Sequence, residues 1–460
     1  MGLFVVTAGW LIGLRPLADN SFLTHLATGR FILETGSVPG HDPYTFTAAG
    51  EPWVVQSWLV SVLYATAESL GGLGAVRIVV GFLAALLTGL GWRLLAPADG
   101  VVPRLAAAAL FVGVGASLWA ERPLMVGLIC LAIVLLALEQ DLDPRWLLPM
   151  GWLWVNSHGS FPLGVVLVVL SAVGRRLEGG SAAVEWRALR WFLPGVLLGA
   201  VGPLGWRVLV FPLELLERQD VLRNVIEWRA PEFDTIGQRL FILQLMVTIV
   251  LLARRPSRRH ALLVATFAGA ALLSLRNVPV ASLVMLPAMA EGLVGMGSLS
   301  SHARPRVTRM VATVAVAALV VATAARFAQN DLELRKYPVA PLAYLESNGV
   351  DLREVPLAAP DLVGNLVDYV YGAEQQTFYD DRFDMFPEDV TAAHASLLTA
   401  APDMREQLDD FDIDLVALRH ASPSAQILTL DLGWRRLLLD DEWVLVCRRG
   451  AEVGGSIGEC

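Results

Sequence analysis

Long apolar stretches separated by short polar ones dominate the first 326 residues of the chain. The hydrocarbon core of a bilayer is about 30 Å thick and takes roughly 20 apolar residues per helix, so this pattern predicts about 11 transmembrane helices. Short segments such as 145–156 and 189–202 can form broken or re-entrant helices if they line a cavity and do not face lipid. The predicted segments are 3–17, 73–95, 104–120, 124–139, 145–156, 160–174, 189–202, 237–253, 260–275, 279–296 and 308–326.

The first long polar interruption, residues 19–56, directly follows the first apolar segment and is therefore expected at a membrane surface. Apolar side chains recur at helical spacing over 21–35, and a second helix is predicted at 52–70. Residues 207–227 have the pattern of a further interfacial helix. The outer loop 18–72 is thus predicted to be a structured segment that carries two interfacial helices.

The last part of the chain, residues 327–460, alternates short helical and strand patterns. Such alternation predicts a small α/β domain with a partly parallel sheet. The predicted helices are 339–347, 360–371, 388–400 and 423–431, and the predicted strands are 355–359, 376–379, 413–418 and 442–448.

Composition supports this division into a membrane domain, 1–326, and an acidic domain, 327–460. Of the 460 residues 55% are hydrophobic and only 17% are charged, whereas globular soluble domains carry about 25% charged residues. Residues 327–460 hold 25 Asp and Glu against 10 Lys and Arg. Such an acidic domain argues against a nucleic-acid partner, because phosphates bind cations.

Cysteine usage predicts neither a zinc site nor a disulfide framework. The three cysteines are Cys130, Cys447 and Cys460, and they form no CxxC motif or Cys/His cluster. The sequence also contains no Walker loop, GxSxG, HExxH or dinucleotide fingerprint. No sequence motif therefore identifies a cofactor.

The placement of arginine predicts the orientation, because cytoplasmic loops of membrane proteins are enriched in Lys and Arg. We interpret residues 3–17 as a retained helix and not a signal peptide. With a cytoplasmic N-terminus, the loop order places three basic clusters inside, and it places the outer loop 18–72 and the C-terminal domain outside. The clusters are Arg175, Arg176, Arg187 and Arg190; Arg254, Arg255, Arg258 and Arg259; and Arg304, Arg306 and Arg309.

Three polar residues of the outer loop are the catalytic candidates. Asp19 can act as a general base or bind a divalent cation, but it can equally cap the helix at 21–35. His25 lies on the apolar side of that helix, where a lone histidine is usually a satisfied buried side chain, but its position six residues after Asp19, facing other membrane helices, equally favours a site. Asp42 precedes Pro43, a common turn opener, in a loop held between two helices, and such loops often carry function.

A second set of polar residues is predicted near outer membrane ends, where it could form a substrate-binding cavity. Arginine suits phosphate, although snorkelling to the headgroups explains a single arginine equally well. Asp380-Asp381-Arg382 follows a predicted strand end, and we interpret it as a surface salt bridge. The substrate-binding candidates are Arg122, Asn156, His158, Glu227, Trp228, Arg276 and Asn277.

The order of these motifs resembles the GT-C glycosyltransferase superfamily, and is distantly similar to protein mannosyltransferases and lipid A aminoarabinose transferases. The likeness covers most of the chain and extends to Asp380-Asp381-Arg382 and Gly433-Trp434-Arg435. Its main motifs are Asp19…His25-Leu26-Ala27-Thr28-Gly29…Gly36…Val38-Pro39…Asp42-Pro43-Tyr44-Thr45-Phe46-Thr47, Arg122-Pro123, Trp154-Val155-Asn156-Ser157-His158-Gly159, Pro203-Leu204-Gly205, Ile226-Glu227-Trp228 and Arg276-Asn277.

The resemblance implies a polyprenyl-phosphate-linked sugar as donor, action on the outer face of the bacterial plasma membrane, and a catalytic aspartate at the position of Asp19. The chain departs from the bacterial pattern at Ser21, which stands where a second acid is expected, and this weakens a metal-binding role. The leading hypothesis is a membrane glycosyltransferase with a glycan, lipid or protein acceptor. The alternatives are a non-catalytic lipid- or glycan-binding protein on a GT-C scaffold, and a transporter.

Overall fold

The computed structural model describes residues 1–218, 226–296, 305–329, 331–374 and 376–460. The chain forms two compact units. The helical unit consists of Met1–Leu17 and Thr66–Leu332, and the mixed unit consists of Ala18–Ala65 and Glu333–Cys460. Most of the outer loop therefore belongs to the same compact unit as the acidic C-terminal part. The division at residue 326 instead assigns this loop to the membrane domain.

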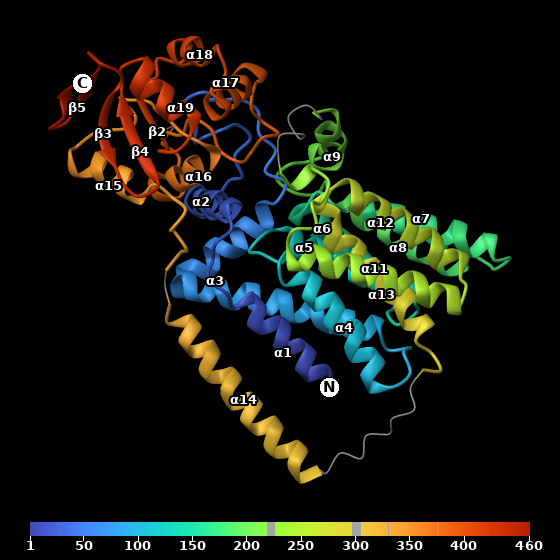
Figure 1. Cartoon of the computed structure of the whole chain (residues 1–460). Helices are drawn as coiled ribbons and strands as arrows, with labels where there is room; N and C mark the ends of the chain where they lie inside the picture. The colour runs from blue at the N-terminus through green and yellow to red at the C-terminus, as the bar shows by residue number, and fades with distance from the viewer. Residues whose placement is uncertain (219–225, 297–304, 330, 375) are drawn as a thin grey trace. The chain divides into compact units, whose positions relative to one another are not determined.

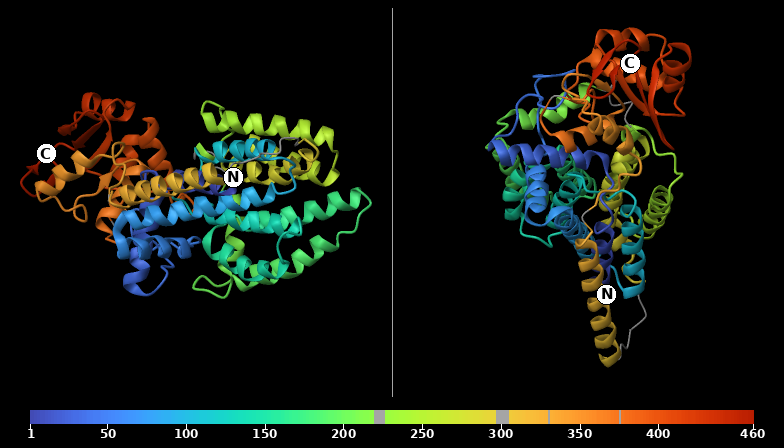
Figure 2. Two further views of the ribbon diagram at one scale, coloured as in Figure 1. Left: turned by 90° about the horizontal axis from the view of Figure 1, so that it is seen from below. Right: turned by 90° about the vertical axis from the view of Figure 1, so that its left-hand side faces the viewer.

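The helical unit is a bundle in which each of the eleven predicted apolar segments coincides with a helix (Figures 1 and 2). The longer helix α3 (Trp58–Leu94) starts in the mixed unit and breaks at Gly71 and Gly72, where Gly72 has a φ of 64°. The other elements are α1 (Gly2–Gly13), α4 (Val101–Gly115), α5 (Leu124–Leu138), η1 (Pro144–Trp146), α6 (Leu147–Ser157), α7 (Pro162–Leu177), α8 (Ala183–Leu198), α9 (Arg207–Glu217), η2 (Ile226–Trp228), α11 (Ile236–Arg254), α12 (Arg258–Leu273), η3 (Leu275–Asn277), α13 (Val278–Gly292) and α14 (Pro305–Phe327).

The bundle is organised around α5 and α13, whose residues are nearly all buried. Helices that are apolar on every face are expected at such central positions. Among the described helices, α3 and α11 are long and apolar enough to cross a membrane. The total of about 11 transmembrane helices stays a prediction.

The predicted interfacial helices are partly corrected. Helix α2 (Asn20–Thr35) confirms the prediction at 21–35, but the second helix begins at Trp58 and not at residue 52. In the third, α9 covers the first half of the predicted 207–227, and Pro212 lies inside it. Residues 219–225 of that prediction, and Arg304 of the third basic cluster, lie outside the described residues.

Buried ion pairs link helices of the bundle at two of the arginines used for the orientation. Arg259 Nη2 lies 2.7 Å from Glu139 Oε1, and Arg175 Nε lies 2.7 Å from Glu185 Oε1. Glu185 is fully buried. These two arginines therefore also have a packing role, because a buried carboxylate needs a paired cation.

The mixed unit places helices around a small sheet. Its first element is α2. The others are α15 (Val339–Ser347), β1 (Leu357–Ala358), α16 (Asp361–Tyr371), α17 (Glu388–Thr399), α18 (Met404–Asp410), β2 (Leu415–Arg419), α19 (Pro423–Gln426), η4 (Ile427–Asp431), β3 (Arg435–Leu439), β4 (Trp443–Cys447), β5 (Glu452–Gly454) and β6 (Gly458–Glu459).

The sheet has the order β1-β2-β4-β3, and Figure 1 labels β2, β4 and β3 side by side in its red part. Strands β1 and β2 are parallel, and the other two pairs are antiparallel, so the prediction of a partly parallel sheet is confirmed. The strand predicted at 376–379 is wrong, because this segment forms only an isolated bridge from Thr377 to Thr45. That bridge ties the outer loop to the C-terminal part.

One hydrophobic core is shared by the two sequence segments of the mixed unit. Tyr44 and Trp53 from the outer loop are buried in the same cluster as Phe386, Val416 and Val446 from the C-terminal segment. Separating the segments would expose this apolar surface to water, at about 25 cal/mol per Å². The outer loop therefore contributes to the hydrophobic core of the mixed unit.

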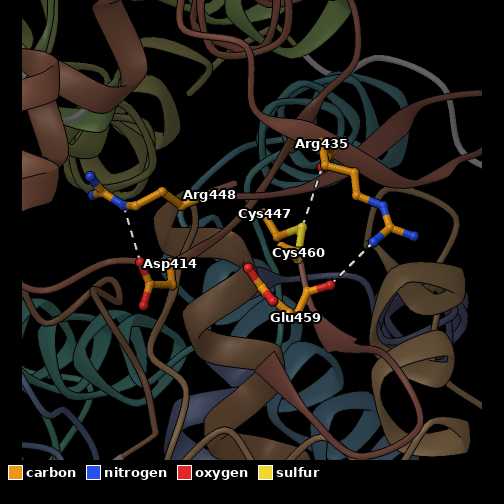
Figure 3. The surroundings of a disulfide bond; sticks show 6 residues. All are labelled: Asp414, Arg435, Cys447, Arg448, Glu459 and Cys460. Carbon is orange, nitrogen blue, oxygen red and sulfur yellow. Dashed lines mark hydrogen bonds and ion pairs between the residues drawn. A yellow bond between two sulfur atoms is a disulfide. The ribbon is translucent and has the colours of Figure 1, made fainter. Parts of the chain in front are cut away.

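A disulfide between Cys447 and Cys460 corrects the prediction that no disulfide is present. The β5–β6 hairpin returns the chain after β4, and the Cys460 N–H donates to the Ala451 carbonyl. Figure 3 shows the bond beside Arg435 and Glu459. Disulfides persist in oxidising compartments.

Candidate functional site

Asp19 is the N-cap of α2. Its backbone is extended, and its Oδ1 accepts a hydrogen bond of 3.0 Å from the Ser21 N–H. A capping carboxylate satisfies an N–H group that has no partner within the helix, and it interacts favourably with the helix dipole. The capping role considered from the sequence is therefore confirmed. Its catalytic role stays a prediction.

His25 lies where α2 comes very close to the start of α3. Its Nδ1 is 3.2 Å from the Ser61 hydroxyl. One turn further on, a Cβ at Gly29 would lie 2.0 Å from the Ser61 carbonyl oxygen, so only glycine fits there. The Gly29 contact thus brings the two helices close enough for the His25 ring to reach Ser61.

Asp42 is buried and shapes its own turn. Its Oδ1 accepts from the Tyr44 N–H at 3.1 Å, and its Oδ2 accepts from the Thr45 N–H at 3.0 Å and from the Thr45 hydroxyl. Its Oδ1 also lies 2.7 Å from Arg382 Nη1, at an angle too oblique for a hydrogen bond. The turn-forming interpretation is confirmed, and the ion pair adds a link to the C-terminal segment.

Arg382 is buried, so the interpretation of its motif as a surface salt bridge is wrong. Its Nε and Nη2 donate to both carboxylate oxygens of Asp380 at 2.5–3.0 Å. Its guanidinium also lies over the rings of Tyr44 and Trp53, 4.9 and 4.4 Å from their centroids. The outer-loop aromatic rings thus enclose a charge that the sequence motif alone suggests is exposed.

A third carboxylate completes this buried charged cluster. Asp368 on α16 is fully buried and accepts hydrogen bonds from the hydroxyls of Thr377, at 2.6 Å, and Thr24, at 3.4 Å. Burial, and then the charge of Asp380, raises the pKa of the Asp368 carboxyl well above its ordinary value. Burial lowers the pKa of Arg382, but Asp380 and Asp42 outweigh it and hold that pKa well above its ordinary value.

Two substrate-binding candidates of the helical unit form an ion pair. Arg122 Nη1 contacts Glu227 Oε1, with 29% and 36% of the two side chains exposed. The Arg276 guanidinium lies 5.2 Å from the centroid of the Trp228 ring. The hydroxyl of Ser274, in the turn before Arg276, donates to the Glu227 carbonyl oxygen at 3.1 Å. The structure therefore brings Arg122, Glu227, Trp228 and Arg276 together.

The other three candidates contact neighbouring backbone and hydroxyl groups, and their substrate-binding role stays a prediction. Asn156 is buried and donates to the carbonyls of Trp152 and Gly199, which links α6 to α8. His158 Nδ1 lies 2.8 Å from the Ser160 hydroxyl and accepts from the Ser160 N–H. The Asn277 amide donates to the Ala270 carbonyl at 3.3 Å.

The predicted residues thus divide between the two units. Asp19, His25 and Asp42 belong to the mixed unit, and the seven substrate-binding candidates belong to the helical unit. Over the described ranges, no group of three or more His, Cys, Asp or Glu residues is arranged to hold a metal ion. The sequence missed the buried cluster around Arg382 because its aromatic walls come from a distant segment.

Comparisons with known proteins address the fold. No protein-family model matches the chain, and no curated protein matches it. Among solved structures, the archaeal oligosaccharyltransferase AglB from Archaeoglobus fulgidus, in complex with an inhibitory peptide and a dolichol-phosphate, matches with a TM-score of 0.53 and 12% identity over 91% of this chain and 69% of that chain. ArnT from Cupriavidus metallidurans, bound to undecaprenyl phosphate, matches with a TM-score of 0.49 and 13% identity over 98% of each chain.

AglB is a GT-C glycosyltransferase, and the match to it extends over nearly the whole chain. At 12% identity this likeness concerns the fold, and residue roles do not transfer with it. The resemblance predicted from the sequence motifs is confirmed at that level: the chain has a GT-C-like fold.

Proposed function

We propose that this protein is a membrane glycosyltransferase that moves a sugar from a polyprenyl-phosphate donor to an acceptor on the outer face of the bacterial plasma membrane. The observation that carries the proposal is the likeness of fold to AglB, which was solved with a dolichol-phosphate, itself a polyprenyl phosphate. The two long apolar helices α3 and α11 fit a membrane location. The acceptor is a glycan, a lipid or a protein.

The proposed orientation has the N-terminus in the cytoplasm and the mixed unit outside. The arginine clusters support it. The Cys447–Cys460 disulfide supports it independently, because disulfides are rare in the reducing cytoplasm. A reporter that is active only outside the cytoplasm, fused after residue 460, should be active, and a silent fusion would reverse the orientation.

In the proposed mechanism Asp19 removes the proton of the acceptor hydroxyl as the sugar bond forms. His25 orients the acceptor. Asp42 acts as a positioning residue, because its carboxylate is already engaged by the Tyr44–Thr45 turn and Arg382. Positioned general bases contribute about 10²–10⁴-fold to rate.

Arg122 and Arg276 hold the departing lipid phosphate in this mechanism. Preorganised cations stabilise the negative charge that develops on a leaving group, and loss of one such donor costs about 10²–10³-fold in rate. Glu227 and the Trp228 ring already hold the two guanidinium groups in place. A phosphate would then compete with Glu227 for Arg122. A divalent cation near Asp19 is a further proposal that metal titration of the transfer reaction tests.

Substitution of Asp19 by Asn separates catalysis from capping. Asparagine caps a helix about as well as aspartate, but it cannot accept the proton. We expect Asp19→Asn to keep the thermal stability of the wild type and to lose about 10²–10⁴-fold in sugar transfer from a polyprenyl-phosphate donor. Asp143→Asn is the matched control, because Asp143 is another N-cap aspartate that accepts from a backbone N–H two residues on.

Full transfer activity in Asp19→Asn would contradict the role of Asp19 as base. A second candidate function is a non-catalytic lipid- or glycan-binding protein, and the capping bond of the Asp19 carboxylate supports it, because this bond gives Asp19 a structural role that needs no catalysis. Native mass spectrometry of the detergent-purified protein distinguishes the two. A bound polyprenyl-phosphate sugar that is turned over when acceptor is added supports the enzyme, and one that stays bound unchanged supports the binding protein.

A further inference from the structure

The mixed unit contains a pocket whose lining includes none of the catalytic or substrate-binding candidates. Its volume is ≈ 250 Å³, and its lining comes from α18, from the turn before β3 and from the residues after β4. The lining residues are Arg405, Leu408, Leu432, Trp434, Arg448 and Arg449. Three arginines at one pocket are unusual for residues 327–460, which hold only 10 basic residues against 25 acidic ones.

One of these arginines is held in place by the domain. Arg448 donates to Asp409, lies 3.1 Å from Asp414 Oδ1 and donates to the Ile413 carbonyl at 2.9 Å, and Figure 3 shows its link to Asp414. Its guanidinium lies 5.1 Å from the centroid of the Trp434 ring. Arg448 is therefore neutralised and forms a fixed wall of the pocket.

Arg405 and Arg449 supply the other two guanidinium groups of the pocket. Both side chains are exposed, and no ion pair or side-chain hydrogen bond to either is found among the described residues. Arg449 follows the disulfide-bonded Cys447 by two positions, so the covalent link fixes the backbone beside it. Two free guanidinium forks at a fixed pocket are suited to an anionic group, because the arginine fork matches carboxylate and phosphate oxygens.

We propose that this pocket binds one acidic sugar residue, which bears a carboxylate or a phosphate group. Arg405 and Arg449 bind the anionic group, while Leu408, Leu432 and Trp434 contact the apolar face of the ring. The volume lies just below the about 300–1,000 Å³ of pockets for drug-sized ligands, which limits the occupant to about one ring. The anionic part of the assignment rests on the pocket alone, and the sugar part rests on the proposed function.

Equilibrium binding to the purified full-length protein, measured by isothermal titration calorimetry, tests the proposal without any donor. Glucuronic acid and glucose 6-phosphate are the probes, and the arm that binds more tightly identifies carboxylate or phosphate as the group recognised. Glucose tests the need for charge, and inorganic phosphate tests the need for a ring. We expect both acidic sugars to bind more tightly than glucose and inorganic phosphate.

Arg405→Gln and Arg449→Gln should each weaken binding of the acidic sugars about tenfold, the effect of losing one charge-assisted hydrogen bond. Arg436→Gln is the matched control, because Arg436 is an exposed arginine of β3 that does not line the pocket. Equal loss in Arg436→Gln, or glucose binding as tightly as the acidic sugars, would overturn the anion site. Inorganic phosphate binding as tightly as glucose 6-phosphate would overturn the sugar assignment. Neither result depends on transfer activity, so failure here is distinct from failure of Asp19 as base.

Discussion

Removal of the Arg382 guanidinium tests whether the buried charged cluster holds the mixed unit together. Arg382→Met keeps an apolar stem but leaves Asp42 and Asp380 buried without their cation. Loss of one partner of a buried ion pair costs about 3–5 kcal/mol, because an uncompensated charge stays in the interior. The loss of the stacking on Tyr44 and Trp53 acts in the same direction.

The two carboxylates should respond differently to this loss. In the variant, Asp42 keeps the N–H groups of Tyr44 and Thr45, whereas Asp380 keeps the N–H of residue 382. Adding Asp380→Asn to Arg382→Met should therefore recover more stability than adding Asp42→Asn. Residues that share one charged network couple by about 0.5–3 kcal/mol, and the double variants should fall in that range.

Hydrogen exchange of the full-length protein in detergent, followed by mass spectrometry, provides the measurement. Peptides covering 42–55 and 376–386 report the opening of the two segments that the cluster joins, and their opening free energy should fall by about 3–5 kcal/mol in Arg382→Met. Arg353→Met is the control, because its pair with Asp351 is exposed and should leave exchange unchanged. Wild-type exchange rates in Arg382→Met would refute the reasoning.

Three further predictions concern the mixed unit. The pKa of Asp368 is raised in the folded state, so the stability that Asp368 contributes is present below the ordinary pKa of an aspartate and is lost as the pH rises. The free energy of unfolding of the wild type, relative to that of Asp368→Asn, should therefore increase as the pH falls. Burial lowers the pKa of His394 to about 3, so the stability that the neutral imidazole contributes is present above pH ~6.5. Below that pH the free energy of unfolding should fall by up to about 1.4 kcal/mol per pH unit. This decrease should be absent in His394→Phe. Cys447→Ser removes the disulfide and should lower the free energy of unfolding by about 2–4 kcal/mol, measured by hydrogen exchange of residues 447–460. Cys130→Ser is the control, because it leaves the disulfide intact and should leave this hydrogen exchange unchanged.

The elements predicted correctly from the sequence are those whose signal is local. The apolar segments are helices throughout, and the helix predicted at 339–347 is α15 with the same bounds. Strands β2 and β4 were found because central strands give continuous apolar runs. Strand β3 was missed because it is an edge strand with an exposed start, and its sequence, Arg435–Leu439, shows no alternation.

The features of the mixed unit that were predicted wrongly from the sequence depend on contacts between distant segments. Asp380-Asp381-Arg382 looks like a surface motif because its composition is charged. It is buried because Tyr44 and Trp53, more than 300 residues earlier, supply aromatic walls around Arg382. The disulfide was missed for a similar reason, since the two cysteines meet only through the β5–β6 hairpin.

The position of the proposed base depends on the C-terminal segment through α2. Helix α16 holds α2 along its length: the Asn365 amide donates to the Asn20 carbonyl, Asp368 accepts from Thr24, and Arg30 donates to the Tyr369 carbonyl. A Cβ at Gly364 would lie 1.9 Å from the Tyr379 carbonyl oxygen, so α16 is itself tightly packed on the segment that leads to Arg382. We therefore expect changes at the buried charged cluster to shift the start of α2 through these packed contacts. Because misplacement of a catalytic group by about 1 Å can cost about 10²-fold in rate, the acidic C-terminal segment is a structural requirement of the chemistry proposed for Asp19.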